Sequence, residues 1–379
     1  MVPRLHDERT ESSDDTARIN VHQYFVPAGG FGVRRETDRN PRRRWRHDAR
    51  GAGMRLPIGL LIALACALCL IAAAAASANG FKVGISERNL SVWQDPRFEQ
   101  LGVRQTRLLV SYDQALIGDF AAYDEWMAAA RARGVDVLVV INRASDSYTS
   151  LPTSYEYREV VRAIRARWPW VTTMGAWNEA NHPEQPTAHR PERAARYYNI
   201  MRQECLGCRI VTPDVLDSKG MSRWVRRFMR HAQHPRLWGL HNYGDVNRPS
   251  RWGNSGTRKL LRIVRGRVWL TETGGIVRFA DRYRGTPGDE VRAARAVAWA
   301  FRFARRSARI RRVYLYEWSA DPVFEAWDSG LVAADGRARP GLAVLRRQLN
   351  RHRRRAALQP VPPLPAYPQG ALPAALSRG

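Results

Sequence analysis

The chain has 379 residues, of which 44% are hydrophobic, and its formal net charge is +27. This length and apolar share exclude a wholly disordered chain and suffice for one large domain. A charge this high raises nucleic acid, an anionic membrane surface or an acidic polymer as partners. However, the arginines that carry it are scattered along the chain, which is typical of a G+C-rich genome, and no nucleic-acid-binding motif accompanies them. We therefore expect no nucleic-acid partner.

The first two segments differ sharply in composition. Residues 1–53 are rich in Arg, Asp, Glu and Gly without a sustained hydrophobic period, so we expect them to be disordered or untranslated. Residues 54–78 comprise a basic start, an apolar run over 56–77 and an Ala-Ser-Ala end. This pattern predicts a cleaved signal peptide, although a run of this length could also remain as a membrane anchor. In both cases we expect the rest of the chain to be secreted, or anchored on the outer face of the cytoplasmic membrane.

The domain that we expect over residues 79–351 alternates short apolar runs with amphipathic stretches. Alternation of this kind is typical of successive β-α units around a parallel sheet. The predicted strands are eight runs, at 81–85, 105–111, 135–141, 172–177, 209–213, 238–243, 268–273 and 313–318. Eight repeats indicate an α/β fold, a (β/α)8 TIM barrel, rather than a doubly wound sheet, which would more often carry a Gly-rich turn after its first strand.

Helices are expected between these strands, at 119–133, 156–166, 191–203 and 222–232. After the seventh strand, Thr286, Pro287 and Asp289 supply an N-cap, a first-turn proline and an early acid for a further helix. The chain ends in residues 352–379, which are Arg-rich and then Pro/Ala-rich, and which we expect to form a tail outside the domain.

Two cysteines, Cys205 and Cys208, lie in the predicted domain and are spaced C-x-x-C. In a cytosolic protein this spacing suggests redox or zinc chemistry. Export favours a disulfide between them instead, and zinc would need two further ligands that the neighbouring sequence does not offer.

Two of the predicted strands end in glutamate. Glu179 follows the fourth strand and Glu272 lies at the end of the seventh, 93 residues later. Catalytic groups of such barrels project from the C-terminal ends of the strands, so the two carboxylates should face each other across the barrel mouth. A carboxyl pair about 5 to 5.5 Å apart is what a retaining glycosidase needs, with one nucleophile and one acid/base. Taken alone, each glutamate has an ordinary alternative. Glu179 could be a loop or helix-start residue, and Glu272 could be a solvated residue at a strand end.

At these positions the sequence resembles the clan A glycoside hydrolases, which are retaining (β/α)8 enzymes that include families 5, 10 and 39. That clan places an Asn-Glu pair after the fourth strand and a glutamate nucleophile at the end of the seventh. The resemblance implies that Glu179 is the acid/base, that Glu272 is the nucleophile, and that Asn178 hydrogen-bonds the sugar 2-hydroxyl.

Four more residues resemble the family 5 pattern. The resemblance implies that Arg107 keeps the nucleophile ionised, that His241 and Tyr243 form the His-x-Tyr motif of the sixth strand, and that Trp318 is a sugar platform. Each also has an ordinary alternative. Arg107 could be a surface arginine, His241 a core histidine, and Tyr243 and Trp318 packing residues of the barrel. The chain departs from many members of family 5 at Asn142, where they carry histidine.

The sequence thus predicts an exported retaining hydrolase of O-glycosides whose partner is an oligo- or polysaccharide with β-linkages. A non-catalytic carbohydrate-binding protein on a degenerate barrel is the alternative. A variant of the first prediction is a membrane-anchored protein, held through 56–77, whose basic surface holds an anionic glycan. We expect no metal or other cofactor, because the histidines form no close ligand set in the sequence and the clan needs none.

Overall fold

The computed structural model of the chain describes residues 80–248, 251–321 and 326–357. The predictions made for residues 1–53, for the apolar segment 54–78 and for residues 358–379 lie outside this part of the chain. Among the described residues, no helix has the length and apolar composition needed to cross a membrane.

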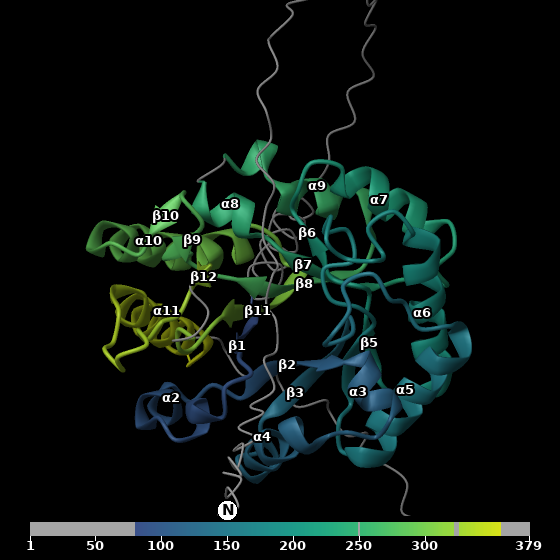
Figure 1. Cartoon of the computed structure of the whole chain (residues 1–379). Helices are drawn as coiled ribbons and strands as arrows, with labels where there is room; N and C mark the ends of the chain where they lie inside the picture. The colour runs from purple at the N-terminus through teal and green to yellow at the C-terminus, as the bar shows by residue number, and fades with distance from the viewer. Residues whose placement is uncertain (1–79, 249–250, 322–325, 358–379) are drawn as a thin grey trace, which may run out of the picture.

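The described residues form one curled parallel sheet at the centre of the molecule, surrounded by helices (Figure 1). Its strand order is β5-β4-β3-β2-β1-β11-β8-β7-β6. The strands are β1 (Lys82–Ser86), β2 (Gln105–Ser111), β3 (Asp136–Asn142), β4 (Thr173–Gly175), β5 (Arg209–Val211), β6 (Val215–Leu216), β7 (Leu237–His241), β8 (Arg267–Thr273) and β11 (Ile310–Tyr316).

The two short edge strands, β5 and β6, are halves of one barrel strand. β5 pairs with β4, and β6 pairs with β7. Between the halves, the amide of Thr212 donates to the carbonyl of Leu237 at 2.9 Å, which joins the two edges of the sheet. Pro213 follows and has no amide hydrogen, so the strand is interrupted there. The eight-strand barrel is thereby confirmed, with its fifth strand in two pieces.

Helices cover the outside of the sheet. They are α2 (Pro96–Leu101), α3 (Tyr112–Leu116), α4 (Ala121–Ala132), α5 (Ser154–Arg167), α6 (Pro191–Glu204), α7 (Met221–Met229), α8 (Tyr243–Asn247), α9 (Gly256–Ile263), α10 (Pro287–Ala304) and α11 (Pro340–Ala357). The four helices predicted by range are present as α4, α5, α6 and α7. The predicted start of α10 is confirmed as a capping box between Thr286 and Asp289, with Pro287 in the first turn. A small second sheet contains β9 (Arg278–Phe279), β10 (Tyr283–Arg284) and β12 (Trp327–Asp328).

Side chains fill the barrel interior. Leu138, Val140, Trp269 and Tyr314 pack there in one cluster with Val211. Gly84 on β1 is required by this packing, because a Cβ at that position would lie 2.5 Å from a ring carbon of Tyr314. The larger apolar core lies between the sheet and the helices, as expected for a barrel whose interior is packed rather than open.

The predicted disulfide is present. Cys205 at the end of α6 is bonded to Cys208 just before β5, with their Cα atoms 5.5 Å apart.

The end of the domain lies later than the sequence indicates. α11 continues to Ala357, beyond residue 351, where we placed the start of the tail. The ring of His352 lies 5.0 Å from that of Phe81, and the side chain of Arg353 donates to the carbonyl of Leu101. These contacts tie the Arg-rich end of α11 to the barrel, which a composition rich in arginine does not indicate.

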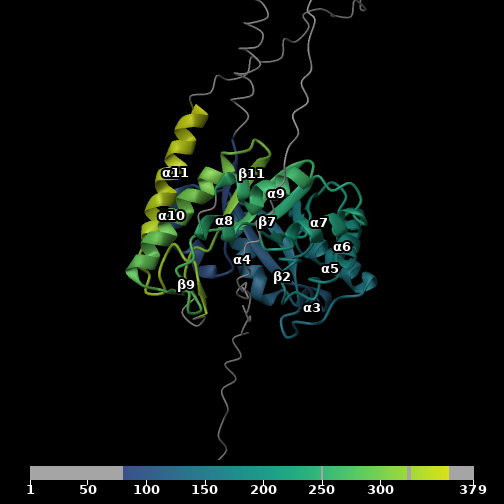
Figure 2. The same cartoon turned by 90° about the horizontal axis from the view of Figure 1, so that it is seen from above.

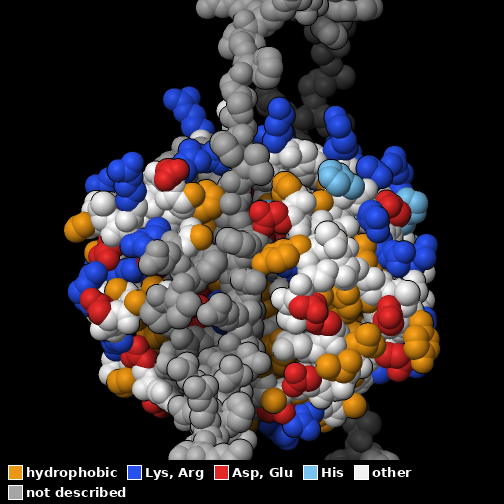
Figure 3. Space-filling view, in the orientation of Figure 1, with side chains coloured by type: hydrophobic (Ala, Val, Ile, Leu, Met, Phe, Trp, Pro, Cys, Tyr) orange, Lys and Arg blue, Asp and Glu red, His pale blue; other side chains and the backbone are white. Residues whose placement is uncertain are grey.

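On the face shown in Figure 3, lysine and arginine side chains lie mainly around the outline of the molecule and are interspersed with Asp and Glu.

Candidate active site

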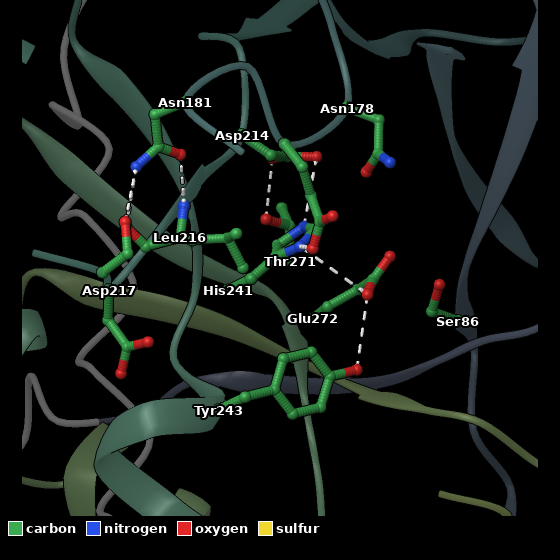
Figure 4. A network of polar contacts seen from close by, with 12 residues as sticks. Ser86, Asn178, Asn181, Asp214, Leu216, Asp217, His241, Tyr243, Thr271 and Glu272 are labelled. Carbon is green, nitrogen blue, oxygen red and sulfur yellow. Dashed lines mark hydrogen bonds and ion pairs between the residues drawn. The ribbon is translucent and has the colours of Figure 1, made fainter. Parts of the chain in front are cut away.

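The predicted carboxylate pair meets at the C-terminal ends of the strands, together with a histidine. Glu179 follows β4, His241 ends β7, and Glu272 lies on β8. One side-chain atom from each of the three lies within 4.8 Å of those of the other two, and all three residues are buried. Figure 4 shows Tyr243 and His241 beside the carboxylate of Glu272. The sequence prediction that residues 93 positions apart face each other therefore agrees with the structure.

The backbone at Glu179 has an unusual conformation, with φ at 45°. A non-glycine residue in this left-handed region costs on the order of 1 to 3 kcal/mol and requires support from its surroundings. Hydrogen bonds provide it: the amide of Ala180 donates to the carbonyl of Asp214 at 2.8 Å, and the amide of His182 donates to the carbonyl of Glu179 at 2.7 Å. The turn after β4 is thus fixed to the segment between β5 and β6, and the Glu179 side chain is held in one place.

Arg107 is the cation at the centre of the site. Its side chain is buried on β2, and it donates to the carboxylate of Glu272 and, at 2.9 Å, to that of Asp214. It also donates to the side-chain oxygen of Asn178 at 2.7 Å. Burial lowers the pKa of Arg107, but the charges of Glu272 and Asp214 outweigh it, so the net pKa is raised. The predicted contact between Arg107 and the nucleophile candidate is present.

Tyr243 contacts the other oxygen of Glu272. Its hydroxyl donates to Glu272 Oε2 at 3.3 Å. Burial and the charge of Glu272 raise the pKa of Tyr243 well above its usual range, so the phenol keeps its proton and acts as a donor. Both oxygens of Glu272 are therefore held by hydrogen-bond donors.

His241 connects the acidic groups. Its Nδ1 lies 2.8 Å from Glu179 Oε1 and 3.6 Å from Glu272 Oε2, and its Nε2 lies 3.4 Å from Asp214 Oδ2. Burial lowers the pKa of His241, but the charge of Glu272 and hydrogen bonds with Asp214 and Glu179 raise it to about 10. A pKa of about 10 favours the imidazolium form of the ring at neutral pH.

Asp214 is a functional residue that the sequence analysis missed. Its side chain is fully buried, accepts hydrogen bonds from Arg107 and Thr271 and contacts His241. Burial raises the pKa of Asp214, but Arg107 and His241 lower it by more than burial raises it. The net pKa is below its usual range, so the carboxylate is ionised. The available signal was its place: Asp214 directly follows Pro213, where the predicted fifth strand stops.

The two glutamates have unlike surroundings. Glu272 faces the guanidinium of Arg107 and the hydroxyl of Tyr243, both of which stabilise an anion. Glu179 contacts His241 through Oε1 alone, and its buried Oε2 has no hydrogen-bond partner in the part of the chain that the structure describes. Glu272 is thus the better-stabilised anion, and Glu179 has an oxygen available for proton transfer. This is the division of roles that a nucleophile and an acid/base require.

The structure corrects the prediction for Trp318. Its side chain is 1% exposed and packs edge-on against Phe98 of α2, with ring centres 5.4 Å apart. Its indole N–H donates to Asp95, the N-cap of α2, at 3.1 Å. Trp318 therefore belongs to the layer between sheet and helix and offers no face to a sugar. The strand ends at Tyr316, two residues before the predicted end, which explains the error.

The aromatic residues that do lie beside the site are Tyr243, Tyr316 and Trp327, which pack together with Ile276. Tyr316 is the last residue of β11 and Trp327 begins β12. Tyr316 was not among the predicted site residues.

A groove lies next to the turn that carries Glu179. Its volume is about 750 Å³, and the segments after β3 and β4 line it, with Tyr148, Thr149, Pro183, Glu184, Gln185, Pro186, His189 and Arg190. Arg143 stacks on the ring of Tyr148 at 3.5 Å and so shapes one wall.

Glu179, His241 and Glu272 are also the one set of potential metal ligands that is close enough in the described residues. The chemistry of the set does not favour a cation. A histidine ligand must be neutral, whereas His241 is held protonated, and Arg107 already provides a positive charge at Glu272.

Replacing Asp214 with asparagine tests the balance of charge in the site. Asp214→Asn keeps the shape but removes one of the anions that balance the buried Arg107 and His241, so we expect the free energy of unfolding to fall by about 3 kcal/mol. Urea unfolding measures this change, with the exposed Glu125→Gln as an isosteric control that should change it by less than about 0.5 kcal/mol. Equal stability of Asp214→Asn and the control would show that the charge of Asp214 is not needed.

The raised pKa of His241 predicts how stability depends on pH. A histidine whose pKa is about 10 when folded and about 6.5 when unfolded binds a proton more tightly in the folded chain. Its stabilising contribution is therefore complete below pH 6.5 and is lost as the pH rises toward 10. We expect the free energy of unfolding to fall by several kcal/mol between pH 7 and pH 10, at about 1.36 kcal/mol per unit of pKa difference. In His241→Gln this fall should be smaller; equal falls in urea titrations of both proteins would contradict the assignment.

No family model matches the sequence, and no curated protein matches it. Solved structures do match. The fold is similar to that of GH5_18 from Streptomyces cattleya in complex with GlcNAc, with 17% identity, 75% of this chain and 82% of that chain covered, and a TM-score of 0.52. It is also similar to xylanase 10B from Thermotoga maritima, with 11% identity, 72% and 96% covered, and a TM-score of 0.52. A family 39 glycoside hydrolase from Bacteroides cellulosilyticus matches with 13% identity, 72% and 64% covered, and a TM-score of 0.52.

At these identities the likeness concerns the fold. The chain shares its (β/α)8 barrel with glycoside hydrolases of the families that the sequence motifs resemble, so the predicted fold class is confirmed.

Proposed function

We propose that the chain is an exported retaining hydrolase of O-glycosides that acts on a β-linked glycan, with Glu272 as nucleophile and Glu179 as acid/base. The observation that carries the proposal is the buried pair itself. Glu179 and Glu272 each have a carboxylate oxygen within 4.8 Å of the other's, which suits the close pair of a retaining enzyme, at about 5 to 5.5 Å, better than the pair about 6.5 to 9.5 Å apart of an inverting one.

In the first step, an oxygen of Glu272 attacks the anomeric carbon and forms an ester bond to the sugar. The bond from that carbon to the leaving oxygen breaks, and Glu179 transfers a proton to this oxygen. Arg107 and Tyr243 donate to the two oxygens of Glu272 and hold its carboxylate in place before the attack. Glu179 holds the proton on Oε2, its oxygen without a hydrogen-bond partner among the described residues, while Oε1 stays in contact with His241 at 2.8 Å.

In the second step, Glu179 takes a proton from water while the water oxygen attacks the anomeric carbon. The ester bond to Glu272 breaks, the sugar leaves with its original configuration, and both glutamates return to their starting states. The imidazolium of His241 lies beside both carboxylates, so it offsets the negative charge that alternates between them.

The substrate class is inferred from the site and from its structural neighbours. One neighbour is a variant of the Streptomyces cattleya GH5_18 protein in complex with Manβ1-4GlcNAc, and others are xylanase variants in complex with xylotriose or xylotetraose. A sugar unit over Glu272 would lie against Tyr243 and Tyr316, and the leaving portion would extend past Glu179 into the groove after β4. The roles of Asn178, Arg107, His241 and Tyr243 in binding this substrate belong to the same proposal.

Export is supported by two observations. The segment 54–78 has the composition of a signal peptide or anchor, and a disulfide joins Cys205 to Cys208. Disulfides persist in oxidising surroundings outside the cytoplasm. The protein is thus proposed to be secreted or held on the outer face of the cytoplasmic membrane.

The alternative, a carbohydrate-binding protein on the same barrel, would need aromatic faces and hydrogen bonds but no ionisation machinery. Arg107, Asp214 and His241 are buried around the two glutamates, and burying so many charged groups is unfavourable unless they serve a purpose. Their presence favours the hydrolase.

A panel of aryl β-glycosides and β-linked polysaccharides, incubated with the full chain, tests the proposal. We expect hydrolysis of at least one member, its loss in Glu272→Gln and its retention in Glu125→Gln. Glycan binding without hydrolysis in all three proteins would favour the carbohydrate-binding alternative.

A further inference from the structure

A second cavity lies at the end of the barrel opposite the glutamates. Its volume is about 940 Å³, and it opens among the first residues of β1, β5, β7, β8 and β11. Glu179, His241 and Glu272 lie at the other ends of their strands, so this cavity is separate from the proposed active site. No Asp or Glu lines it, whereas its cationic lining comprises Lys82, Arg202, Arg209, Arg236, Arg267, Arg311 and Arg312.

Part of this positive charge is balanced and part is not. Arg209 and Arg312 share the carboxylate of Asp136, at 3.4 and 2.8 Å. In contrast, Lys82, Arg236 and Arg267 are exposed, and within the described residues their side chains make no hydrogen bond or ion pair. These three residues, called the basic trio below, leave a positive surface around a concave site, which is suited to phosphate groups.

The end of α11 extends this positive surface. His352 lines the cavity, and Arg351, Arg353 and Arg354 beside it are exposed. Figure 2 shows that α11 reaches the end of the molecule opposite β9 and α3, the elements that lie on the side of the active site. The cavity and the end of α11 together form one basic face.

The chain enters the barrel at this face. Its entry point places the predicted apolar run close to the cavity and so favours a membrane surface over a soluble anion as the partner. Gly80 lines the cavity, and only residues 78 and 79 separate it from the predicted apolar run at 56–77. Extended residues span at most about 3.6 Å each, so the cavity lies within about 11 Å of the end of that run. The inference takes the alternative in which this run is retained as a membrane anchor, for which about 20 apolar residues suffice to cross the hydrocarbon core of a bilayer. The basic face would then lie at the level of the lipid headgroups.

We propose that this basic face docks on anionic phospholipid headgroups, with their phosphates bound in the cavity by the basic trio. Docking in this way directs the opposite end of the barrel, with Glu179 and Glu272, away from the membrane and toward polymers beyond it. The inference concerns a separate surface and does not depend on the proposed hydrolysis.

Hydrogen exchange of the full chain in lipid nanodiscs tests this proposal. We compare nanodiscs of phosphatidylcholine with nanodiscs that also contain phosphatidylglycerol, and follow the backbone amides of residues 205–209, 234–237 and 264–267 at the cavity. We expect exchange at these amides to be at least about fivefold slower with phosphatidylglycerol, and the difference to vanish near 1 M salt, where charges are screened within about 3 Å.

Two matched variants separate the cavity from net charge. Lys82→Gln/Arg236→Gln/Arg267→Gln should abolish the difference between the lipids, whereas Arg196→Gln/Arg223→Gln/Arg295→Gln, which removes the same charge from exposed positions of α6, α7 and α10, should retain it. Equal exchange in both lipids, or equal loss in both variants, would overturn the proposal. So would the same slowing by inorganic phosphate in phosphatidylcholine nanodiscs, since it would identify the partner as a soluble anion.

Discussion

The variant Glu272→Gln is expected to lower kcat/KM on a β-glycoside by roughly 10⁴-fold or more, while the chain stays folded. An amide of the same shape keeps the packing beside Arg107 and Tyr243, but it cannot form the ester with the anomeric carbon. Initial rates on an aryl β-glycoside, with unfolding curves for both proteins, measure the loss. The paired Glu125→Gln should retain the full rate.

A second variant of the same residue makes this test specific to a nucleophile. In Glu272→Gly the carboxylate is missing and space is left in its place, so added formate can supply a carboxylate and restore part of the rate. A rate for Glu272→Gln within tenfold of the native chain would contradict the assigned role. So would a failure of formate to raise the rate of Glu272→Gly when the native chain hydrolyses the same substrate.

Glu179→Gln is expected to act differently on different leaving groups. General acid catalysis contributes about 10²- to 10⁴-fold, and the whole of it is lost for a poor leaving group such as a sugar hydroxyl. A dinitrophenolate needs no proton, so formation of the ester on Glu272 should be nearly normal with that substrate and its breakdown should become slow. Pre-steady-state release of dinitrophenol should therefore show a burst that the native chain lacks.

The pH dependence gives the control for this second prediction. Loss of the acid/base removes one limb of the pH profile of kcat/KM on a poor leaving group, whereas a variant that merely disturbs the fold lowers the rate at every pH. Equal losses on activated and unactivated substrates, with both limbs of the profile retained, would contradict the role of Glu179.

The barrel and its carboxylate pair were predictable because their signals are local. Each strand is a short apolar run with a recognisable end, and Glu179 and Glu272 lie at two of those ends. A closed barrel brings the C-terminal ends of its strands together, so the meeting of residues far apart in the chain follows from the count of repeats. The N-cap of α10 was equally local, since Thr286, Pro287 and Asp289 suffice to define it.

Asp214 and Trp318 show what such signals cannot supply. Asp214 lies in the interruption after Pro213, and its role depends on contacts with Arg107 on β2 and His241 on β7, which no pattern near residue 214 encodes. Trp318 was predicted at a strand end, but β11 stops at Tyr316 and the next turn sends the indole toward Phe98. In both places the path of the chain past the strand end decides which side chain reaches the site.

The basic face was also beyond the sequence analysis. Lys82, Arg236 and Arg267 are separated by long stretches of chain and look like any of the scattered cations in an arginine-rich sequence. They become neighbours because parallel strands begin at one end of the barrel. Composition alone favoured a dispersed charge, and only the arrangement of strand starts distinguishes this face from the rest of the surface.

The stereochemistry of hydrolysis is the most direct measurement of the proposed mechanism. Proton NMR of the full chain acting on a β-glycoside identifies the anomer that forms first, before mutarotation mixes the two. Because Glu179 and Glu272 have carboxylate oxygens within 4.8 Å of each other, as suits the close pair of a retaining enzyme, we predict that the β-anomer appears first. Initial formation of the α-anomer would show inversion and would contradict the assignment of Glu272 as the nucleophile.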